Sequence, residues 1–261
     1  MPELRLSTSV ASSANVRGFG IIAETDELLV VDKPAFLLIH PTRPDGRRTL
    51  WSEVRNLLAF EIANGGQVSI VNRLDRETSG LVLIAKSAHA ARQLGVLMQR
   101  HLIAKEYLAI VWGWPEWDCM LVDAPLLRQG SVSASKIFLK QTIHPNGAKA
   151  ITELRVVQRF VRPSSSGDRF SLIRATPRTG RTHQIRVHLA SVGHPIIGDK
   201  IYGPDERCYL EFIETGWTPE LETRLLLPRH ALHSAQLSAA GIGRWESGLP
   251  RDLSTWISGD A

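Results

Sequence analysis

The sequence has few cysteines and no long apolar run, and these two absences exclude several classes of protein. Its two cysteines, Cys119 and Cys208, lie too far apart to suggest a motif. Two thiols rule out a four-cysteine zinc site and fit a reducing compartment, so we expect a cytoplasmic protein. No hydrophobic stretch approaches the roughly 20 residues that cross a bilayer, and residues 1–20 lack the apolar segment of a signal peptide. We therefore expect no membrane partner.

What the sequence does contain is typical of a folded, basic protein. Hydrophobic residues make up 43% of the 261 residues and charged residues 22%, enough for one large domain or two joined lobes. The formal net charge of +5 is compatible with a polyanionic partner but does not by itself identify one. Residues 1–19 are polar and without periodicity, so we predict a flexible tail, followed by a folded unit over residues 20–258.

Hydrophobic patterns predict an α+β fold with a mixed, mostly antiparallel sheet in two joined lobes flanked by helices. Thr49 or Ser52 is a candidate N-cap for a helix that ends at Gly65-Gly66, and Ser87 caps the next one. Residues 114–135 contain Pro, Gly and Ser and are typical of a crossover between lobes. The predicted strands are 21–24, 28–32, 68–71, the apolar run after Gly80, 105–113, 150–160, 170–176 and 231–237, and the other predicted helices are 88–101, 181–192 and 219–226.

One acidic residue, Asp75, stands between two arginines in a predicted hairpin. An apolar run over residues 68–71 leads into Arg73-Leu74-Asp75-Arg76, and a second apolar run follows Gly80. A carboxylate between two guanidinium groups at a strand end is typical of a site that uses the charge. A structural ion pair that holds the hairpin explains the same residues, and this segment alone does not separate the two interpretations.

Two other segments carry candidate functional groups. The first is Lys105-Glu106-Tyr107, on a predicted strand. The second, residues 174–186, has four arginines and no acidic residue around a glycine-containing loop that leads into the predicted helix over 181–192. We expect Thr182 to cap this helix and Gly193 to follow its end. Helix N-termini favour phosphate, and arginine adds bidentate hydrogen bonds. A solvated basic surface is the alternative.

Taken together, these segments resemble the RluA-like family of pseudouridine synthases. Residues 72–81, Asn-Arg-Leu-Asp-Arg-Glu-Thr-Ser-Gly-Leu, are similar to the H-R-L-D-x-x-T-S-G-L signature of that family. Further segments resemble the family in the same order along the chain: 30–34, 105–107, 180–189 and 193–203. The resemblance implies a pseudouridine-synthase-like fold with an active-site cleft across the sheet, and it identifies residues 20–258 as the catalytic domain.

The resemblance also implies the chemistry. It makes Asp75 the catalytic carboxylate, Tyr107 the active-site tyrosine and Arg186 the arginine that pairs with the aspartate. The implied reaction detaches uracil from C1′ of a uridine, rotates it and rejoins it through C5, so we expect no cofactor and no metal. An adjacent guanidinium keeps the carboxylate ionised, and the tyrosine can stack on the base and accept or relay the C5 proton.

The expected partner is structured RNA, an rRNA or tRNA stem-loop from which the target uridine is extruded. Arg73 is our candidate for filling the vacated place in the stack, because a planar guanidinium both stacks and hydrogen-bonds. The first 20 residues are too few for the separate RNA-binding domain of many relatives, so we expect the catalytic domain to hold the RNA. We also expect a monomer without a protein partner. The other predicted RNA-contact residues are Arg76, Thr78, Arg178, Arg181, His183 and Gln184.

The sequence departs from the family pattern at two positions. Asn72 stands where the family has histidine, which weakens any acid–base role there, and Phe36 displaces the glycine that follows the early Lys-Pro motif. We expect Phe36 to reshape the nearby loop. Three histidines, His183, His188 and His194, lack the spacing of a zinc helix, so we expect them to pack rather than to bind metal.

Two other functions stay open. One is an RNA-binding protein that has kept the fold and lost turnover, although intact Asp75, Tyr107 and Arg186 argue against it. The other is a glycosidase-like hydrolase with Asp75 as nucleophile. It needs a second carboxylate at a suitable distance, and nothing in the sequence indicates that Glu77 faces Asp75.

Overall fold

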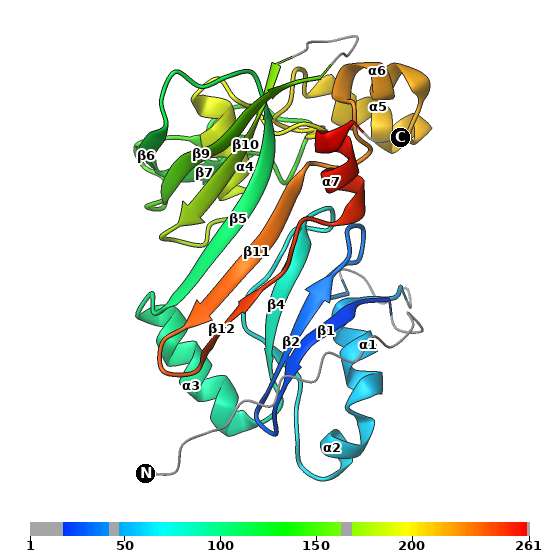
Figure 1. Ribbon diagram of the computed structural model, residues 1–261, viewed down its shortest axis with the longest axis vertical. Helices are drawn as coiled ribbons and strands as arrows, with labels where there is room; N and C mark the ends of the chain where they lie inside the picture. The colour runs from blue at the N-terminus through cyan, green and yellow to red at the C-terminus, as the bar shows by residue number, and fades with distance from the viewer. Residues whose placement is uncertain (1–17, 42–46, 163–168, 260–261) are drawn as a thin grey trace.

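The computed structural model describes residues 18–41, 47–162 and 169–259, and one ten-stranded sheet runs through it (Figure 1). Its strands lie in the order β1-β2-β4-β11-β5-β10-β9-β6, with β3 beside β4 and β12 beside β11. Its strand pairs are antiparallel except β11 with β4, which is parallel. The predicted α+β fold with a mostly antiparallel, mixed sheet is confirmed. The strands are β1 (Gly20–Glu24), β2 (Leu28–Lys33), β3 (Ser69–Ile70), β4 (Ser79–Ala85), β5 (Ile103–Trp112), β6 (Cys119–Asp123), β9 (Ile151–Val161), β10 (Arg169–Pro177), β11 (Leu232–Ala239) and β12 (Gly243–Glu246).

Seven α-helices and a second, small sheet complete the described part of the chain. The small sheet pairs β7 (Leu126–Arg128) with β8 (Gln141–Ile143), and a short 3₁₀ turn covers Gln129–Ser131. Within the described ranges, no helix is long and apolar enough to cross a membrane. The helices are α1 (Leu50–Leu57), α2 (Ala59–Ala63), α3 (Ala88–Gln99), α4 (Gln184–Ser191), α5 (Arg207–Thr215), α6 (Pro219–Leu225) and α7 (Arg251–Ser258).

Capping residues set the beginning of the early helices. The Thr49 side chain accepts the N–H of Ser52, and the Ser52 side chain accepts the N–H of Thr49, so both predicted candidates take part in one capping box. Ser87 caps α3 as predicted, by accepting the N–H of Ala90. The first predicted helix was too long as a single element, because the chain breaks at Leu58 into α1 and α2.

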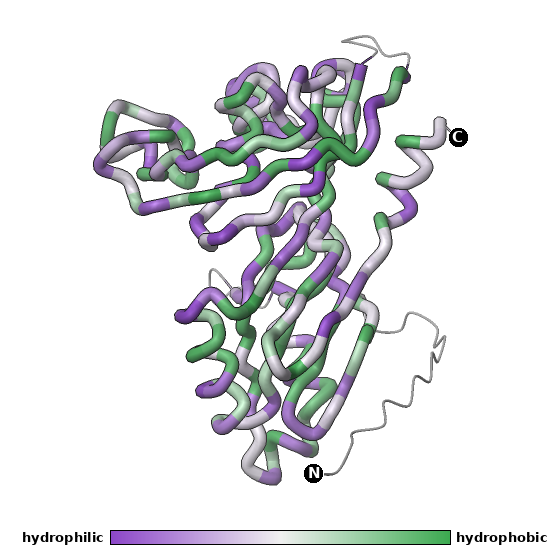
Figure 2. The backbone as a smooth tube through the Cα atoms, turned by 60° about the vertical axis from the view of Figure 1, so that its left-hand side comes forward, coloured by the Kyte–Doolittle hydropathy of each residue, from purple (hydrophilic) through white to green (hydrophobic). Residues whose placement is uncertain are grey.

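Strand β4 is buried on both faces, and it continues the loop that contains Asp75. Val82 and Ile84 pack with Leu50 and Val54 of α1, whereas the alternate residues of β4 pack against α3. Helices α1 and α3 therefore cover opposite faces of the sheet, and hydrophobic stretches follow the strands between them (Figure 2). A strand covered on both sides gives the adjoining loop a rigid base.

Several short elements differ from the prediction. Residues 114–135 are not a bare crossover, because β6 extends the sheet beside β9 and β7 pairs with β8. Helices α5 and α7 and strand β12 lie in segments for which we predicted no element. Phe19, at the end of the predicted tail, packs into the core, while residues 1–17 and the loop over 163–168 lie outside the described residues.

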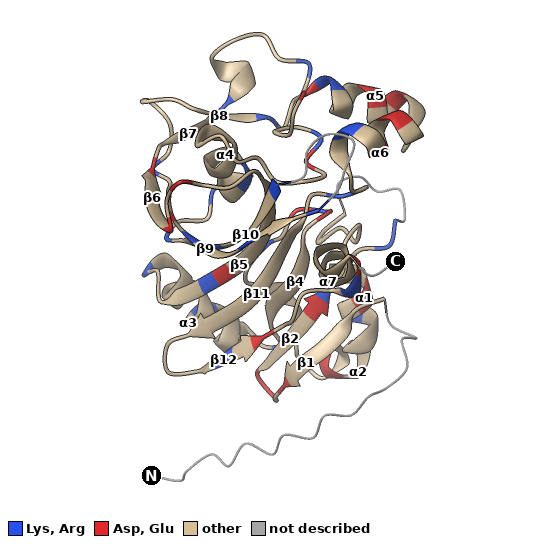
Figure 3. Cartoon of the chain, turned by 45° about the horizontal axis from the view of Figure 1, so that its top comes forward, with Lys and Arg blue, Asp and Glu red and all other residues tan. Residues whose placement is uncertain are grey.

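Acidic residues, red in Figure 3, are concentrated on helices α5 and α6. These two helices carry Glu211, Glu214, Glu220 and Glu222, beside which Arg224 is paired with Glu211 (2.9 Å). An anionic ligand is repelled from these helices and is expected to approach the molecule elsewhere.

Strands β4 and β11 lie very close to each other at Gly80, next to the Asp75 loop. The φ of Gly80 is +108°, and a Cβ there would lie 2.3 Å from the carbonyl oxygen of Ser234. We expect Gly80→Ala to lower the free energy of unfolding by about 3 kcal/mol, because both the backbone angle and the neighbouring strand oppose a side chain. Gly95→Ala is the matched control, since a Cβ at Gly95 in α3 meets nothing within 4 Å. It is expected to add about 0.5–1 kcal/mol of stability. Urea unfolding followed by circular dichroism measures both, and equal stability of Gly80→Ala and the wild type would contradict the prediction.

Candidate active site

Asp75 lies in the loop between β3 and β4, and a buried amide holds the beginning of this loop. The Nδ2 of Asn72 donates to the carbonyl of Leu81 (3.1 Å), and its Oδ1 accepts the N–H of Leu83 (2.8 Å). The side chain thus continues the pairing of β3 with β4 by one more step. Asn72 therefore has a structural role in this loop.

Arg186 of α4 binds Asp75 and a second, fully buried carboxylate at once. Its Nη1 donates to Oδ2 of Asp75 (2.8 Å), while Nε and Nη2 form a bidentate pair with Asp199 (2.7 and 2.9 Å). The backbone N–H groups of Ile201 and Tyr202 donate to the same Asp199 carboxylate (3.0 and 3.1 Å). The predicted Asp75–Arg186 pair is present in the structure, and Asp199 fixes the plane of the guanidinium.

The Asp75 carboxylate is ionised and open to a ligand. Burial alone raises the pKa of Asp75, but electrostatic interactions with His183, Arg186 and His230 and the hydrogen bond from Arg186 outweigh it and leave the pKa below its usual value. The side chain is 30% exposed. Its Oδ2 faces Arg186, whereas Oδ1 makes no hydrogen bond to any described residue. Oδ1 is therefore the oxygen available to react.

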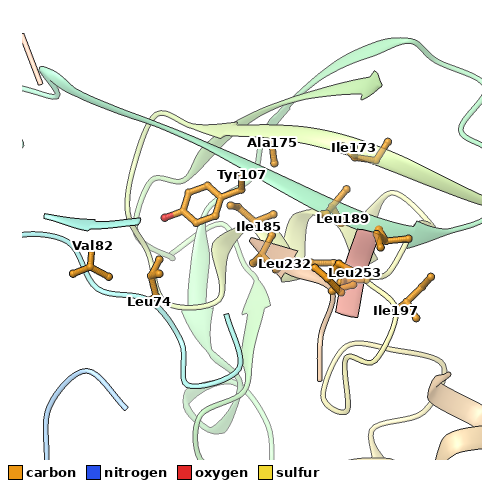
Figure 4. Packing of buried hydrophobic residues seen from close by; sticks show 14 of the residues in the cluster. Leu74, Val82, Tyr107, Ile173, Ala175, Ile185, Leu189, Ile197, Leu232 and Leu253 are labelled. Carbon is orange, nitrogen blue, oxygen red and sulfur yellow. The ribbon is translucent and has the colours of Figure 1, made fainter. Parts of the chain in front are cut away.

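Tyr107 is buried in the middle of β5, paired with Ala175 of β10 and Ser234 of β11. Figure 4 shows its hydroxyl end directed to the side on which Leu74 lies, next in sequence to Asp75. Burial raises the pKa of Tyr107, and the Asp75 charge raises it further, against a hydrogen bond with Ser234 that lowers it. The phenol is therefore neutral at pH 7, and its surroundings do not assist deprotonation.

His183 stands beside Asp75 as a neutral ring. Burial and the Arg186 charge lower the pKa of His183 to about 4. Its Nε2 lies 3.8 Å from Oδ2 of Asp75, and its Nδ1 lies 2.8 Å from the Tyr202 hydroxyl, which accepts the N–H of Gln141 (2.8 Å). With that N–H accepted, the Tyr202 hydroxyl is free to donate to Nδ1. If it does so, the proton of the neutral His183 ring is on Nε2, the nitrogen nearer the carboxylate.

A second charged network lies under the loop, and it was not predicted as part of the site. Lys200 donates to Glu77 (2.9 Å) and to the carbonyl of Pro228 (2.7 Å). The other carboxylate oxygen of Glu77 accepts the backbone N–H of His230 (3.2 Å). Glu77 is thus engaged by its own partners, so it does not supply the second carboxylate that a glycosidase-like site requires.

Lys33 is a further buried cation that ties two loops together. Its Nζ donates to the carbonyls of Pro34 (2.9 Å), Leu37 (3.0 Å) and Arg76 (3.3 Å). Burial and the Arg229 charge lower the pKa of Lys33 to about 7, against the opposite influence of Asp75. The segment after β2 and the Asp75 loop therefore form one unit.

The loop before α4 is not capped as predicted. The N-cap is His183, with φ of +56° and no side-chain cap, and Thr182 is exposed. The Gln184 side chain organises this loop instead: its Oε1 accepts from the Thr179 hydroxyl (2.7 Å) and the Arg181 N–H (3.0 Å). Gln184 is 4% exposed, so we assign it to the framework of the loop rather than to the RNA surface.

The other predicted contact residues separate by exposure. Thr78 is buried and its hydroxyl bonds Nε2 of His230 (2.7 Å), so it too is a framework residue rather than an RNA contact. The four predicted arginines are exposed, and Arg73 and Arg76 lie on the Asp75 loop itself: Arg73, Arg76, Arg178 and Arg181.

The three histidines considered as metal ligands have other partners. His188 lies 2.9 Å from the Thr152 hydroxyl, and His194 lies 2.9 Å from the carbonyl of Trp112. His183 contacts Tyr202, as described above. Over the described ranges, no group of three or more His, Cys, Asp or Glu side chains is placed to hold a metal ion.

Comparison with known proteins identifies the family of the chain. The model of the RNA pseudouridylate synthase family matches residues 27–191, which include Asp75, Tyr107 and Arg186. The chain belongs to this family. The RluA-like resemblance of its motifs is thereby confirmed.

Curated relatives of the chain agree with the match. It is 35% identical over 243 residues to the ribosomal large subunit pseudouridine synthase D of Nitrosomonas europaea, covering 91% of this chain and 64% of that protein. It is also 35% identical over 183 residues to the dual-specificity RNA pseudouridine synthase RluA of Vibrio vulnificus, covering 70% of this chain and 68% of that protein. The chain thus spans about two thirds of the length of these relatives.

Among solved structures, the human RNA pseudouridylate synthase domain containing 4 has the same fold. It is 24% identical, with a TM-score of 0.68, and the match covers 90% of both chains. The pseudouridine-synthase-like fold that the motifs imply is therefore confirmed.

Proposed function

We propose that this chain converts uridines of structured RNA to pseudouridine, with Asp75 as the catalytic carboxylate. The observation that carries the proposal is an ionised, solvent-reachable Asp75 held by a buried Arg186–Asp199 pair next to Tyr107. The reaction breaks the bond from C1′ to N1, forms one from C1′ to C5, and moves a proton from C5 to N1. Because the product is an isomer of the substrate, the step needs no co-reactant.

The geometry suggests what each side chain does in this reaction. Arg186 holds Oδ2 of Asp75, so the free Oδ1 is left to attack C1′ or C6 of the nucleoside or to remove the C2′ proton. Tyr107 is neutral, so we assign it to stacking on uracil and to relaying the C5 proton, rather than to serving as a resident base. The His183 ring packs beside Asp75, with Nε2 3.8 Å from Oδ2, and we assign it to positioning the carboxylate.

Exposed cations around Asp75 support RNA as the partner. The exposed arginines Arg73, Arg76, Arg178 and Arg181 are our candidates for the RNA backbone, whereas the buried His183 side chain is assigned to the surroundings of Asp75. The relatives named as ribosomal large subunit enzymes make large-subunit rRNA the first substrate to test, and tRNA, the other RNA expected from the sequence, is the second. We further propose that the protein acts in the cytoplasm as a monomer.

A single assay separates this proposal from the two alternatives. Purified protein is incubated with rRNA and tRNA transcripts that carry C5-tritiated uridine, and the products are digested and separated. Tritium release together with pseudouridine supports the proposal. Binding without release indicates a catalytically inactive RNA-binding protein, and free uracil indicates a hydrolase.

Arg73 is expected to stabilise the extruded state of the target uridine. It is exposed on the loop beside Asp75 and forms no ion pair with another described residue. We expect Arg73→Ala to lower kcat/KM on full-length RNA by about tenfold or more, because a guanidinium no longer fills the stack. Arg92→Ala, an equal charge change at an exposed position of α3, serves as the control. Equal kcat/KM values for the two variants would show that Arg73 has no such role.

A further inference from the structure

Phe36 occupies a place that neither its backbone conformation nor its packing favours. Its φ is +69°, in the left-handed region that glycine adopts freely and that a Cβ opposes. The side chain is 45% exposed, so burial of the ring does not offset the strain. The glycine expected after the early Lys-Pro motif would suit this backbone better. The backbone has thus kept a glycine-like angle, and the departure from the family pattern adds an aromatic ring to the surface.

This ring lies beside the Asp75 loop. Lys33 donates both to the carbonyl of Leu37, the residue after Phe36, and to the carbonyl of Arg76, the residue after Asp75 (3.0 and 3.3 Å). The Arg76 guanidinium lies 6.0 Å from the centre of the Phe36 ring. Within the described part of the chain, the Arg76 side chain has no ion pair. An exposed ring and an exposed, unpaired cation therefore stand together at the edge of the site.

We propose that Phe36 and Arg76 form a stacking site for the RNA nucleotide next to the target uridine. The proposal rests on the proposed function, because it takes RNA as the substrate. A base presents a flat apolar face that stacks on an aromatic ring, and a guanidinium adds a cation–π contact and a partner for the adjoining phosphate. Arg73 on the same loop extends the positive charge, which favours an anionic ligand over an apolar protein surface. Residues with strained backbone angles cluster at ligand-binding sites, where the strain is kept because the side chain contributes to binding.

The stability and the RNA affinity of Phe36→Gly together separate this proposal from a purely structural role of Phe36. Phe36→Gly restores the residue that suits the backbone, so we expect the midpoint of urea unfolding to rise. The same variant is expected to bind RNA more weakly, by about five- to 150-fold, because one stacked base is lost. A ring that only supports the fold would give the opposite result for stability. Phe36→Trp keeps an aromatic face and is expected to retain affinity within about threefold.

Phe60 provides the matched control. Its ring is 80% exposed on α2, beside Glu61, so Phe60→Ala also removes an exposed ring but from an acidic setting. Affinity is measured in the Asp75→Asn background, with whichever transcript, large-subunit rRNA or tRNA, releases tritium with the wild type. In the active enzyme, which keeps Asp75, we expect Phe36→Gly to raise KM more than it lowers kcat.

Three results would overturn the proposal while leaving the proposed function intact. The first is an RNA affinity of Phe36→Gly equal to that of Phe60→Ala. The second is a loss of both stability and RNA affinity in Phe36→Gly. The third is a sedimentation coefficient that differs between Phe36→Gly and the wild type, which would show that the ring contacts a protein instead. In each of them, the wild type still releases tritium. No tritium release by the wild type from either transcript, with no RNA binding by Asp75→Asn, would instead remove the proposed function and this site with it.

Discussion

Asp75→Asn is expected to lower the rate of pseudouridine formation by at least about 10³-fold, which corresponds to about 4 kcal/mol of transition-state stabilisation. The amide has the shape of the carboxylate but is neither a nucleophile nor a base. Arg186 keeps its bidentate pair with Asp199, so the substitution leaves no buried cation unpaired. We therefore expect the fold and the RNA affinity to persist while turnover is lost.

Single-turnover tritium release, with enzyme in excess over RNA, measures this effect without interference from product release. Asp26→Asn makes the same chemical change in the exposed turn between β1 and β2 and is expected to keep full activity. Urea unfolding of both variants shows whether the fold is intact. A rate for Asp75→Asn within tenfold of the wild type would exclude this residue as the catalytic carboxylate.

The parts of the site that could be predicted were those with a local sequence signal. Asp75 stood out because it is a lone acid between two arginines, and Asn72 because it breaks a motif. The pairing of Asp75 with Arg186 spans 111 residues, so it could be expected only from the resemblance to a family. Asp199 had no role in the prediction, although it stands in one of the matching segments. Its function comes from burial beside Arg186, which the sequence does not reveal.

Side-chain direction explains why two of the predicted contact residues, Thr78 and Gln184, are buried. Thr78 and Gln184 are polar residues in basic loops, and residue type alone places such side chains on the surface. In the fold both point inward, because the His230 ring and the Arg181 N–H need buried partners. Thr182 was wrong as an N-cap because α4 begins one residue later, with His183 as the N-cap and no side-chain cap.

The fold class was predictable because the long strands carry clear apolar runs. Strand β4 is buried along its whole length and β5 buries five of its ten residues, and the apolar residues of both strands mark them in the sequence. Helix α7 buries only Leu253 and Trp256, and β6 buries only Val122. One or two buried residues in a short element do not define a period. Such elements form because the rest of the sheet is already in place.

Arg186→Met is expected to cost both stability and activity, and a second substitution separates the two losses. Removing the guanidinium leaves Asp199 buried and charged, which is expected to lower the free energy of unfolding at pH 7 by about 3–5 kcal/mol. Arg186→Met/Asp199→Asn removes the buried charge, and its amide oxygen can still accept the N–H groups of Ile201 and Tyr202. We expect this double variant to regain most of the stability, measured by urea unfolding, but little of the activity.

The pH dependence of stability and of activity separates the two losses, because Arg186 lowers the pKa of both Asp199 and Asp75. A carboxylate with a lowered pKa stabilises the fold above its unfolded-state pKa of about 3.9, and this contribution is lost as the pH falls through the folded-state value. In Arg186→Met, burial without the guanidinium raises the pKa of Asp199, so the stability gap to the wild type should narrow as the pH falls from that raised value towards the lowered value in the wild type. In the double variant, Asp75 loses its guanidinium and its pKa rises, so the acidic limb of kcat/KM should move to higher pH. Recovery of full activity by the double variant at pH 7 would show that Arg186 serves the fold alone and that Asp75 reacts without its help.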